Sequence, residues 1–299
     1  MTEKEGQHCV NHNRLGLIGG SGLYKMPALA DGDWIDVDTP WGKPSDALLI
    51  GSIGDREVAF LPRHGRGHRL APGEVNYRAN IAALKAAGCT EILALSAVGG
   101  FDADVAPGSF VLVDQYIDRT VRGGRSFFGD GIVAHVAFGR PTCARLGDAV
   151  ARALAADGGP HRIGGTMLVI EGPQFSTRAE SLLHRNWGCH VVGMTGLPEA
   201  RLAREAELCY ASVAMVTDHD AWSDHDVDVA SILAVMDANV ARAQALVVAV
   251  AGLADGGAGC PQGCDHALDG AVITARDAWP VSITRRLAAL APRIFERGK

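Results

Sequence analysis

The sequence predicts an α/β fold, with one domain in which helices surround a central, largely parallel sheet. Apolar stretches of strand length alternate with amphipathic stretches of helix length, which is the pattern of βαβ units. No internal repeat, low-complexity segment or inter-domain linker interrupts this alternation. We expect a flexible tail over 1–13, a single domain over 14–254 and a C-terminal extension with a helix over 255–299.

The bulk composition indicates a globular protein without general affinity for polyanions. Hydrophobic residues make up 47% of the 299 positions, enough for a sizeable core, and the net charge is -6 at pH 7. That charge argues against binding to nucleic acid or to an anionic membrane. No apolar run reaches the eighteen or so residues of a membrane span, and the polar start lacks a signal-peptide core. We therefore expect a cytoplasmic protein.

The first half of the chain predicts strands and one helix. Apolar runs bounded by glycine predict the strands, and Gly54-Asp55 predicts a hairpin turn between two of them. Apolar residues at helical spacing before Gly88 predict a helix over 76–89. The predicted strands are RLGLIGG (14–20), DALLIGSIG (46–54), REVAFLPRHG (56–65), EILALSAVGG (91–100) and GSFVLVDQYID (108–118).

The second half predicts more helices than strands. Two apolar runs, HVVGMT and CYASVAMV, predict strands. A glycine-rich patch over 255–263 predicts a flexible break before the last helix. The helices predicted from apolar periodicity cover 142–157, 180–188, 229–254 and 280–298.

The seven cysteines indicate a reducing compartment, because their number is odd and five of them are scattered. Cys260 and Cys264 are the exception, since they lie four residues apart beside His266. A zinc site needs a fourth ligand and usually a tighter Cys-x-x-Cys spacing. We expect no metal site here, and either a local disulfide or two free thiols.

Two carboxylates follow the apolar run CYASVAMV, in the stretch TDHDAW. At a strand period of two, Asp218 and Asp220 point the same way, and like charges repel more strongly when they are buried. One interpretation is a solvated turn with a helix cap. The other is a binding site in which a ligand supplies donors, or a proton, to both carboxyl groups.

Three other strand ends carry groups suited to an anion, and ligands of open α/β sheets bind beyond such ends. The glycines around Ser21 and the small residues Ser96 and Ala97 offer backbone N–H groups and hydroxyls, and Arg63 and His64 add stronger donors. Each piece alone also fits a tight turn or a basic surface loop. The sequence has neither a Walker lysine nor an acidic magnesium cluster, which favours inorganic phosphate over a nucleoside triphosphate.

Two later stretches suit a nucleoside. In EGPQFSTRAE, Phe175 offers a ring face to a flat base, whereas the serine, threonine and later glutamate also fit a helix cap. In GMTGLPE, Met194 can lie against a sugar and Thr195 can donate to phosphate, although methionine is more often a core residue.

Together these motifs resemble the methylthioadenosine phosphorylases of the trimeric purine nucleoside phosphorylase family. The resemblance runs from about Leu15 to Val250, with IGGSGL, RHGRGH, VNYRANIAALKAAGC, IEGPQFSTRAE and TDHDAW as specific stretches. It implies a mixed, partly barrel-like sheet flanked by helices. It also implies phosphorolysis of 5′-methylthioadenosine in purine and methionine salvage, with phosphate as co-substrate and no cofactor. Gln174, where the family usually has arginine, and the Cys-x-x-x-Cys spacing depart from the pattern.

The resemblance further implies a role for each site residue. The two aspartates would be catalytic and face the purine, while His135 would close the 5′-pocket of a neighbouring subunit, which implies a homotrimer. Phosphate would be held by Ser21, Arg63, His64, Ser96, Ala97 and Thr195. The nucleoside would contact Met194, Phe175, His135, Asp218 and Asp220, with Ser176 and Val229 setting specificity.

Three alternatives stay open from the sequence. The first is the same reaction on a 6-oxopurine nucleoside such as inosine or methylthioinosine. The second is a hydrolase that uses water, against which the arginine and histidine of RHGRGH argue. The third is a nucleotide-binding regulatory module without chemistry, which would release no base from any nucleoside.

Overall fold

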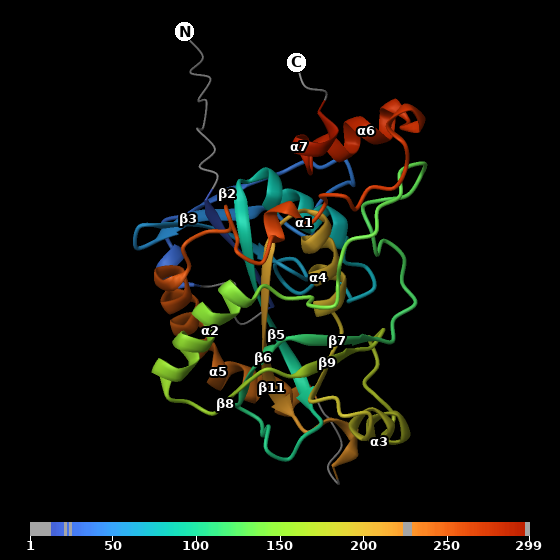
Figure 1. Ribbon diagram of the computed structural model, residues 1–299. Helices are drawn as coiled ribbons and strands as arrows, with labels where there is room; N and C mark the ends of the chain where they lie inside the picture. The colour runs from blue at the N-terminus through green and yellow to red at the C-terminus, as the bar shows by residue number, and fades with distance from the viewer. Residues whose placement is uncertain (1–12, 21–22, 24–25, 224–228, 297–299) are drawn as a thin grey trace.

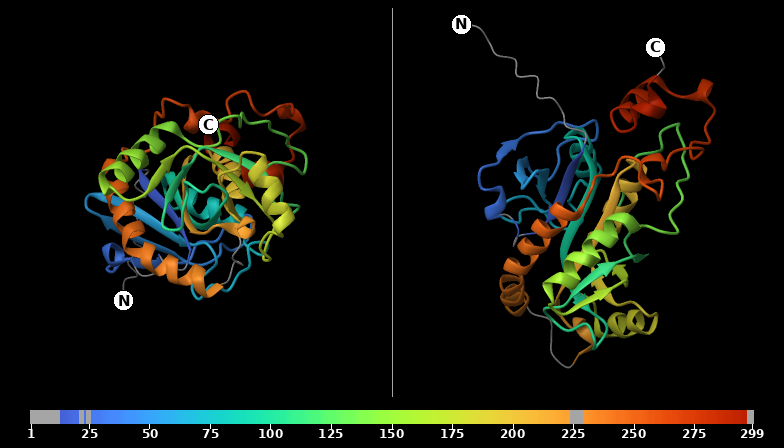
Figure 2. Two further views of the ribbon diagram at one scale, coloured as in Figure 1. Left: turned by 90° about the horizontal axis from the view of Figure 1, so that it is seen from below. Right: turned by 60° about the vertical axis from the view of Figure 1, so that its left-hand side comes forward.

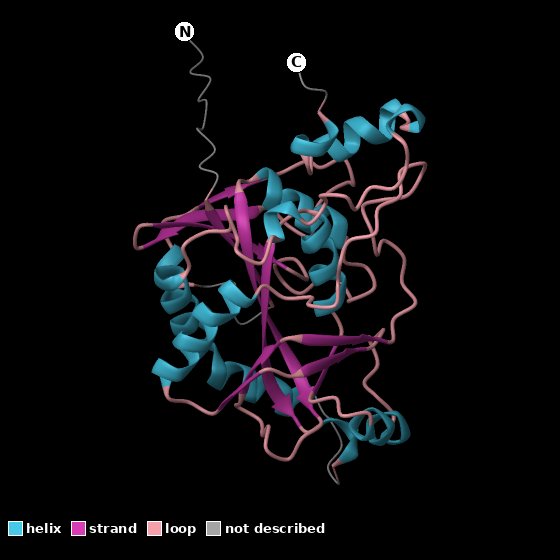
Figure 3. Cartoon of the chain, in the orientation of Figure 1, coloured by secondary structure: helices cyan, strands magenta, loops and turns pink. Residues whose placement is uncertain are grey.

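The computed structural model describes residues 13–20, 23, 26–223 and 229–296. Within these residues, eleven strands form one mixed sheet with helices around it (Figure 1; Figure 3). The strands are β1 (Arg14–Gly19), β2 (Asp33–Ile35), β3 (Leu48–Ile53), β4 (Arg56–Pro62), β5 (Cys89–Gly100), β6 (Phe110–Val113), β7 (Gln115–Asp118), β8 (His161–Ile163), β9 (Thr166–Val169), β10 (Val191–Gly193) and β11 (Cys209–Asp218).

The helices lie outside the strands. They are α1 (Tyr77–Ala86), α2 (Ala144–Asp157), α3 (Arg178–Asn186), α4 (Gly196–Glu205), α5 (Val229–Leu253), α6 (Val281–Ala288) and α7 (Pro292–Phe295). Short 3-10 turns are η2 (Pro27–Leu29), η3 (Asp220–Trp222), η4 (Cys264–His266) and η5 (Arg276–Ala278).

Strand β5 is the hub of the sheet, because it pairs with β1, β10 and β11. One path runs from β5 through β10 and β9 to β7, and a second runs through β11 to β6. Only Asp114 separates β6 from β7, so the two paths meet and the strands close into a barrel-like ring. The mixed, partly barrel-like sheet is thus confirmed. The sheet is also largely parallel, as strand–helix alternation predicted, because six of the ten described strand pairs are parallel. The pairs β2–β3, β3–β4, β5–β10 and β6–β11 are antiparallel.

Helices cover both faces of the sheet (Figures 1 and 2). Helices α2 and α5 lie side by side on one face, and α1 and α4 pack together on the other. The alternation of side chains along β5 serves both layers, since Leu93 and Leu95 join the first core while Ile92 and Ala94 join the second. A strand covered on both faces has to be apolar throughout, which explains the unbroken apolar run at this position.

Many predicted elements lie close to their expected positions. Strands β3 and β4 form the hairpin, with Gly54 at a φ of +58°. Helix α1 ends just before Gly88, whose φ of +82° suits a residue without a side chain. The long helix predicted over 229–254 is α5.

Four expectations about elements need correction. The stretch 108–118 forms two strands, β6 and β7, and the final helix is divided because Pro292 begins α7. Helix α4 was not predicted, since buried acidic side chains disguise its apolar face. The patch over 255–263 is not wholly a surface loop, because Gly256, Gly257 and Cys260 are buried and a Cβ on Gly257 would stand 2.3 Å from the carbonyl oxygen of Thr90.

The cysteines are arranged differently from the expectation. Cys260 and Cys264 are buried free thiols, so the disulfide alternative is wrong. Cys143 and Cys209 are not scattered, because their sulfur atoms join those of the extension in one cluster.

Helix α5 combines a core helix with an apolar outer surface. By length and composition alone it could cross a membrane, with a mean hydropathy of 1.5 over eighteen residues. Asp237 and Arg242 are the only charges that interrupt it. Its C-terminal half packs into the core through Leu246, Val247 and Val250. Core helices of soluble proteins can have the same length and hydropathy, so these two properties are weak evidence for a membrane span.

Candidate active site

A cavity of about 610 Å³ opens at the carboxyl ends of the central strands. Its walls come from the ends of β4, β5, β10 and β11, and α5 covers one side. The volume suits a small organic ligand. Ten of the predicted site residues line it: Arg63, His64, Ser96, Ala97, Phe175, Met194, Thr195, Asp218, Asp220 and Val229.

Three predicted site residues lie elsewhere. The hydroxyl of Ser176 is buried behind the wall near Asp220. His135 is exposed and lines a separate hollow beside Glu205. Ser21 lies outside the described residues.

The two aspartates sit in different environments. Asp218 is held at both oxygens, by the Thr217 hydroxyl at 2.8 Å and by the Asp220 backbone N–H at 2.8 Å. The Asp220 carboxyl is 3% exposed, and its Oδ2 has no hydrogen-bond partner among the described residues. Gly99 permits this crowding, because a Cβ there would stand 3.0 Å from Asp218 Oδ1. The turn is therefore built around an acceptor that a ligand can satisfy, which is not the solvated turn of the alternative interpretation.

Burial raises the pKa of both carboxyl groups. For Asp218 the hydrogen bonds from Thr217 and from the backbone oppose that rise. For Asp220 the hydroxyls of Ser181 and Ser176 lie close enough to oppose it, although neither completes a hydrogen bond in the described part of the chain. The charge of Asp218 raises the pKa of Asp220 further. A shared proton is therefore favoured on this pair.

Arg63 is a buried cation with a fixed orientation. Its Nε and Nη2 donate to the two oxygens of Glu199 at 2.5 and 3.0 Å, and Nη1 donates to the Leu95 carbonyl at 2.8 Å. Burial opposes the charge, but the negative Glu199 outweighs it and holds the pKa of Arg63 above its ordinary value. Tyr210 donates to the same carboxylate at 3.0 Å and fixes it in turn. The remaining N–H groups of the guanidinium can serve an anion.

His64 does not act as the second cation that the sequence suggested. Burial lowers its pKa to about 4, and the charge of Arg63 acts in the same direction. Its Nδ1 lies 2.8 Å from the Leu70 carbonyl, which fixes the proton of the neutral ring on Nδ1 and leaves Nε2 as an acceptor. The ring stacks on His68 with centroids 4.4 Å apart. Neutral His64 can therefore accept a hydrogen bond at Nε2 from a protonated oxygen of an anion.

The N-terminus of α4, the positive end of its helix dipole, lies at the same wall of the cavity as Arg63 and His64. Thr195 precedes the helix, is 4% exposed and makes no capping hydrogen bond, so its hydroxyl is not committed to the helix end. The first N–H groups of a helix lack partners within it and favour an anion nearby.

Sequence reasoning missed three residues at the site. Glu199 orients Arg63 from 136 positions away, a distance that no local pattern reveals. Arg122 donates to the carbonyls of Pro72, Glu171 and Met194, and so ties three wall segments together. Asn239 on α5 lines the cavity, and its buried side-chain nitrogen has no hydrogen-bond partner in the described part of the chain. No local signal distinguishes Arg122, because Arg119 and Arg125 stand in the same polar stretch after β7.

Comparison with known proteins identifies the family of this chain. The model of the phosphorylase superfamily matches residues 14–251. A relative from Cereibacter sphaeroides named S-methyl-5'-thioadenosine phosphorylase is 51% identical over 285 residues, covering 94% of this chain and 98% of the relative. A relative of the same name from Rhodospirillum rubrum is 53% identical over 284 residues, covering 94% and 97%.

Solved structures agree in fold. The crystal structure of a methylthioadenosine phosphorylase from an antarctic soil metagenomic library superposes with a TM-score of 0.86 at 40% identity, covering 93% of this chain and 98% of that one. A mutant adenosine/methylthioadenosine phosphorylase from Schistosoma mansoni, in complex with methylthioadenosine, gives 0.77 at 38% identity, covering 81% and 91%. The chain therefore belongs to the phosphorylase superfamily, within the group of its relatives named S-methyl-5'-thioadenosine phosphorylase.

Proposed function

We propose that this protein cleaves S-methyl-5'-thioadenosine with inorganic phosphate, to give adenine and 5-methylthioribose 1-phosphate. The observation that carries the proposal is one cavity lined by a buried, oriented arginine and by a buried carboxyl pair of raised pKa. The names of the relatives support the choice of nucleoside. The products would enter purine and methionine salvage.

The cationic end of the cavity suits phosphate. Arg63 presents its remaining N–H groups, and the Thr195 hydroxyl with the α4 N-terminus adds uncharged donors. Ser96 and Ala97 complete this wall from β5. Neutral His64 can accept a hydrogen bond at Nε2 from a protonated phosphate oxygen, which helps to orient the phosphate beneath the sugar.

The carboxyl pair suits the leaving base. Breaking the glycosidic bond builds positive charge on the sugar and negative charge on the purine. The phosphate stabilises the first charge and then captures the sugar carbon. A proton passed from the Asp218–Asp220 pair to purine N7 neutralises the second, and the ring of Phe175 can stack on the base. The reaction needs no cofactor, because phosphate supplies the nucleophile and the pair supplies the proton.

We further propose a homotrimer with shared sites. His135 is exposed, lies outside its own cavity and sits on a segment that a neighbouring subunit can reach. Its role at a neighbour's 5′-pocket stays a prediction, which the subunit-mixing experiment below tests.

The deciding experiment measures adenine release from methylthioadenosine with and without phosphate. We expect release only when phosphate is present, with formation of 5-methylthioribose 1-phosphate. Release without phosphate would identify a hydrolase. Absence of release from any nucleoside, with binding retained, would identify a regulatory module.

A further inference from the structure

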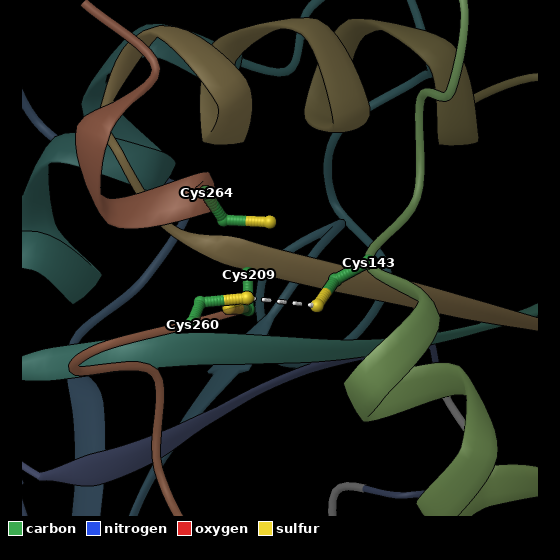
Figure 4. Close-up of side chains that lie close together, drawn as sticks. All are labelled: Cys143, Cys209, Cys260 and Cys264. Carbon is green, nitrogen blue, oxygen red and sulfur yellow. Dashed lines mark hydrogen bonds between the residues drawn. The ribbon is translucent and has the colours of Figure 1, made fainter. Parts of the chain in front are cut away.

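Four cysteines from distant parts of the sequence meet in the core, away from the cavity (Figure 4). Cys143 precedes α2, Cys209 begins β11, and Cys260 and Cys264 belong to the C-terminal extension. All four are buried, and their sulfur atoms lie within 4.8 Å of one another. None lines the cavity or takes part in the proposed reaction.

The spacing of the sulfur atoms fits a tetrahedral metal ion. A zinc–sulfur bond of about 2.3 Å places the sulfurs of a tetrahedral site roughly 3.8 Å apart. The Sγ atoms of Cys143 and Cys260 are 3.6 Å apart, and the widest separation in the cluster is only about an ångström longer than the ideal value. An iron–sulfur cluster attaches its cysteines to different iron atoms and needs more room.

Groups around the cluster suit four thiolates. The Nε of Arg145 is buried without a hydrogen-bond partner among the described residues, although its side chain lies close enough to Cys209 to interact. A thiolate on a metal would give this nitrogen an acceptor, while the other two guanidinium nitrogens pair with Glu91 and Asp255. The backbone N–H of Arg145 also donates to Gln262 at 3.1 Å, which holds the turn between Cys260 and Cys264.

We propose that Cys143, Cys209, Cys260 and Cys264 bind one zinc ion in a closed, structural site. Each thiol gives up its proton to solvent as the ion binds, and no oxidant or reductant is required. The four ligands leave no open position, so the ion has no part in phosphorolysis. It fastens the extension to the start of β11, the strand that ends at Asp218.

The test begins with the full-length protein, purified under reducing conditions and analysed for metals by mass spectrometry. We expect about one zinc per chain. Cys264→Ser should retain roughly a tenth of that zinc or less, because three ligands bind far more weakly than four. Cys89→Ser and Cys189→Ser are matched controls, since both remove a buried free thiol outside the cluster and should keep the metal.

A second measurement does not depend on any variant. The wild-type protein, stripped of metal and given cobalt(II) under reducing conditions, should show thiolate-to-cobalt charge transfer and the visible bands of a tetrahedral ion. A wild type that contains no metal and takes up no cobalt would overturn the proposal. So would iron in place of zinc, or disulfides among these four cysteines in peptides mapped without reduction.

Discussion

At the scale of single residues, the candidate site depends on polar groups whose charge is decided by burial. Asp218 and Asp220 have raised pKa values, His64 has a lowered one, and Arg63 keeps its charge because Glu199 is beside it. The cavity therefore combines the Arg63 cation, the neutral His64 imidazole and a carboxyl pair that favours a proton. This combination suits a reaction that separates charge between a phosphate and a leaving base.

The first prediction concerns Arg63. Alanine at this position would leave the buried charge of Glu199 without its cation. Arg63→Lys is therefore the better variant, since lysine keeps the positive charge but lacks the planar fork of the guanidinium. Loss of a charge-assisted hydrogen bond costs about 1.5–3 kcal/mol, so the KM for phosphate should rise roughly tenfold or more while the KM for nucleoside changes little. Arg66→Lys, whose partner is Asp46 and which does not line the cavity, is the control. Equal changes in both KM values would remove Arg63 from the phosphate end.

The second prediction concerns base choice. A 6-aminopurine offers N–H donors and an N7 acceptor to the carboxyl pair, whereas a 6-oxopurine turns an acceptor toward the unpartnered Oδ2 of Asp220. We expect kcat/KM for methylthioadenosine to exceed that for methylthioinosine or inosine by roughly a hundredfold or more. Asp220→Asn should narrow the gap, because its amide can donate to O6. Equal efficiencies in the wild type would defeat this assignment.

The third prediction concerns pH and His64. Its pKa is about 4 in the folded protein, against 6.5 for an ordinary histidine. Between these two pH values the unfolded chain therefore binds a proton at His64 that the folded chain does not bind. The stability of the protein falls as the pH drops from 6.5 toward 4. Replacement by glutamine should remove this loss. As the pH drops from 6.5 to 4, the free energy of unfolding of His64→Gln should therefore rise relative to that of the wild type by about 1–3 kcal/mol.

Urea unfolding in phosphate-free buffer at several pH values measures this difference. His161→Gln is the control, since that exposed histidine also has Nδ1 near a backbone carbonyl, at 2.8 Å. Parallel curves for His64→Gln and the wild type would show that His64 is not held neutral.

At the scale of elements, helix ends position the site. Helix α3 begins with a capping box. The backbone N–H of Glu180 donates a hydrogen bond to the Thr177 hydroxyl, and the backbone N–H of Thr177 donates one to the Glu180 carboxylate. Helix α3 packs against η3, the turn that carries Asp220. The cap therefore fixes a helix that supports the carboxyl pair, while the α4 N-terminus serves the opposite end of the cavity.

The fourth prediction concerns this capping box. Thr177→Ala should cost about 1 kcal/mol of stability, because the N-cap acceptor is lost. For a protein of this size the melting temperature should fall by about 2–4 °C. The KM for nucleoside should rise while that for phosphate stays constant, since α3 supports only the base end. Thr177→Ser retains the acceptor and should behave like the wild type; a Thr177→Ala variant with unchanged melting would contradict the role of the cap.

At the scale of the whole molecule, the described part of the C-terminal extension packs against the core of the domain without lining the cavity. The extension packs on the α1 and α4 side through Leu268, Leu287 and Phe295 (Figure 1). The segment that carries His135 pairs with the extension at Ala134 and Val272. In the proposed homotrimer, a neighbouring subunit would therefore meet a surface built from both parts of the chain.

The fifth prediction tests the shared site. If His135 completes a neighbour's pocket, His135→Ala and Asp218→Ala should each lose activity, and mixing their subunits should restore part of it. Some mixed trimers then contain a pocket with neither lesion. The measurement is activity after joint unfolding and reassembly, with light scattering for the oligomer. A monomer in solution, or no recovery in mixtures that do form trimers, would end the idea.

The sequence by itself determined the fold class and ten of the residues that line the cavity. Periodicity of two or 3.6 reports which side of an element is buried, so the β3–β4 hairpin, α1 and α5 were predictable. The site motifs were predictable because strand ends of an α/β sheet gather at one edge, which brought Arg63, Ser96 and Asp218 together.

Tertiary structure alone decided the charge states of the site residues and the residues with which they interact. Glu199 meets Arg63 across 136 positions, and Cys143 meets Cys260 across 117, so no local spacing could reveal either contact. The neutral state of His64 likewise depends on burial beside Arg63 and on the Leu70 carbonyl. Periodicity records which face of an element is covered, whereas a pKa or a ligand set depends on which distant groups cover it. That information exists only once the chain has folded.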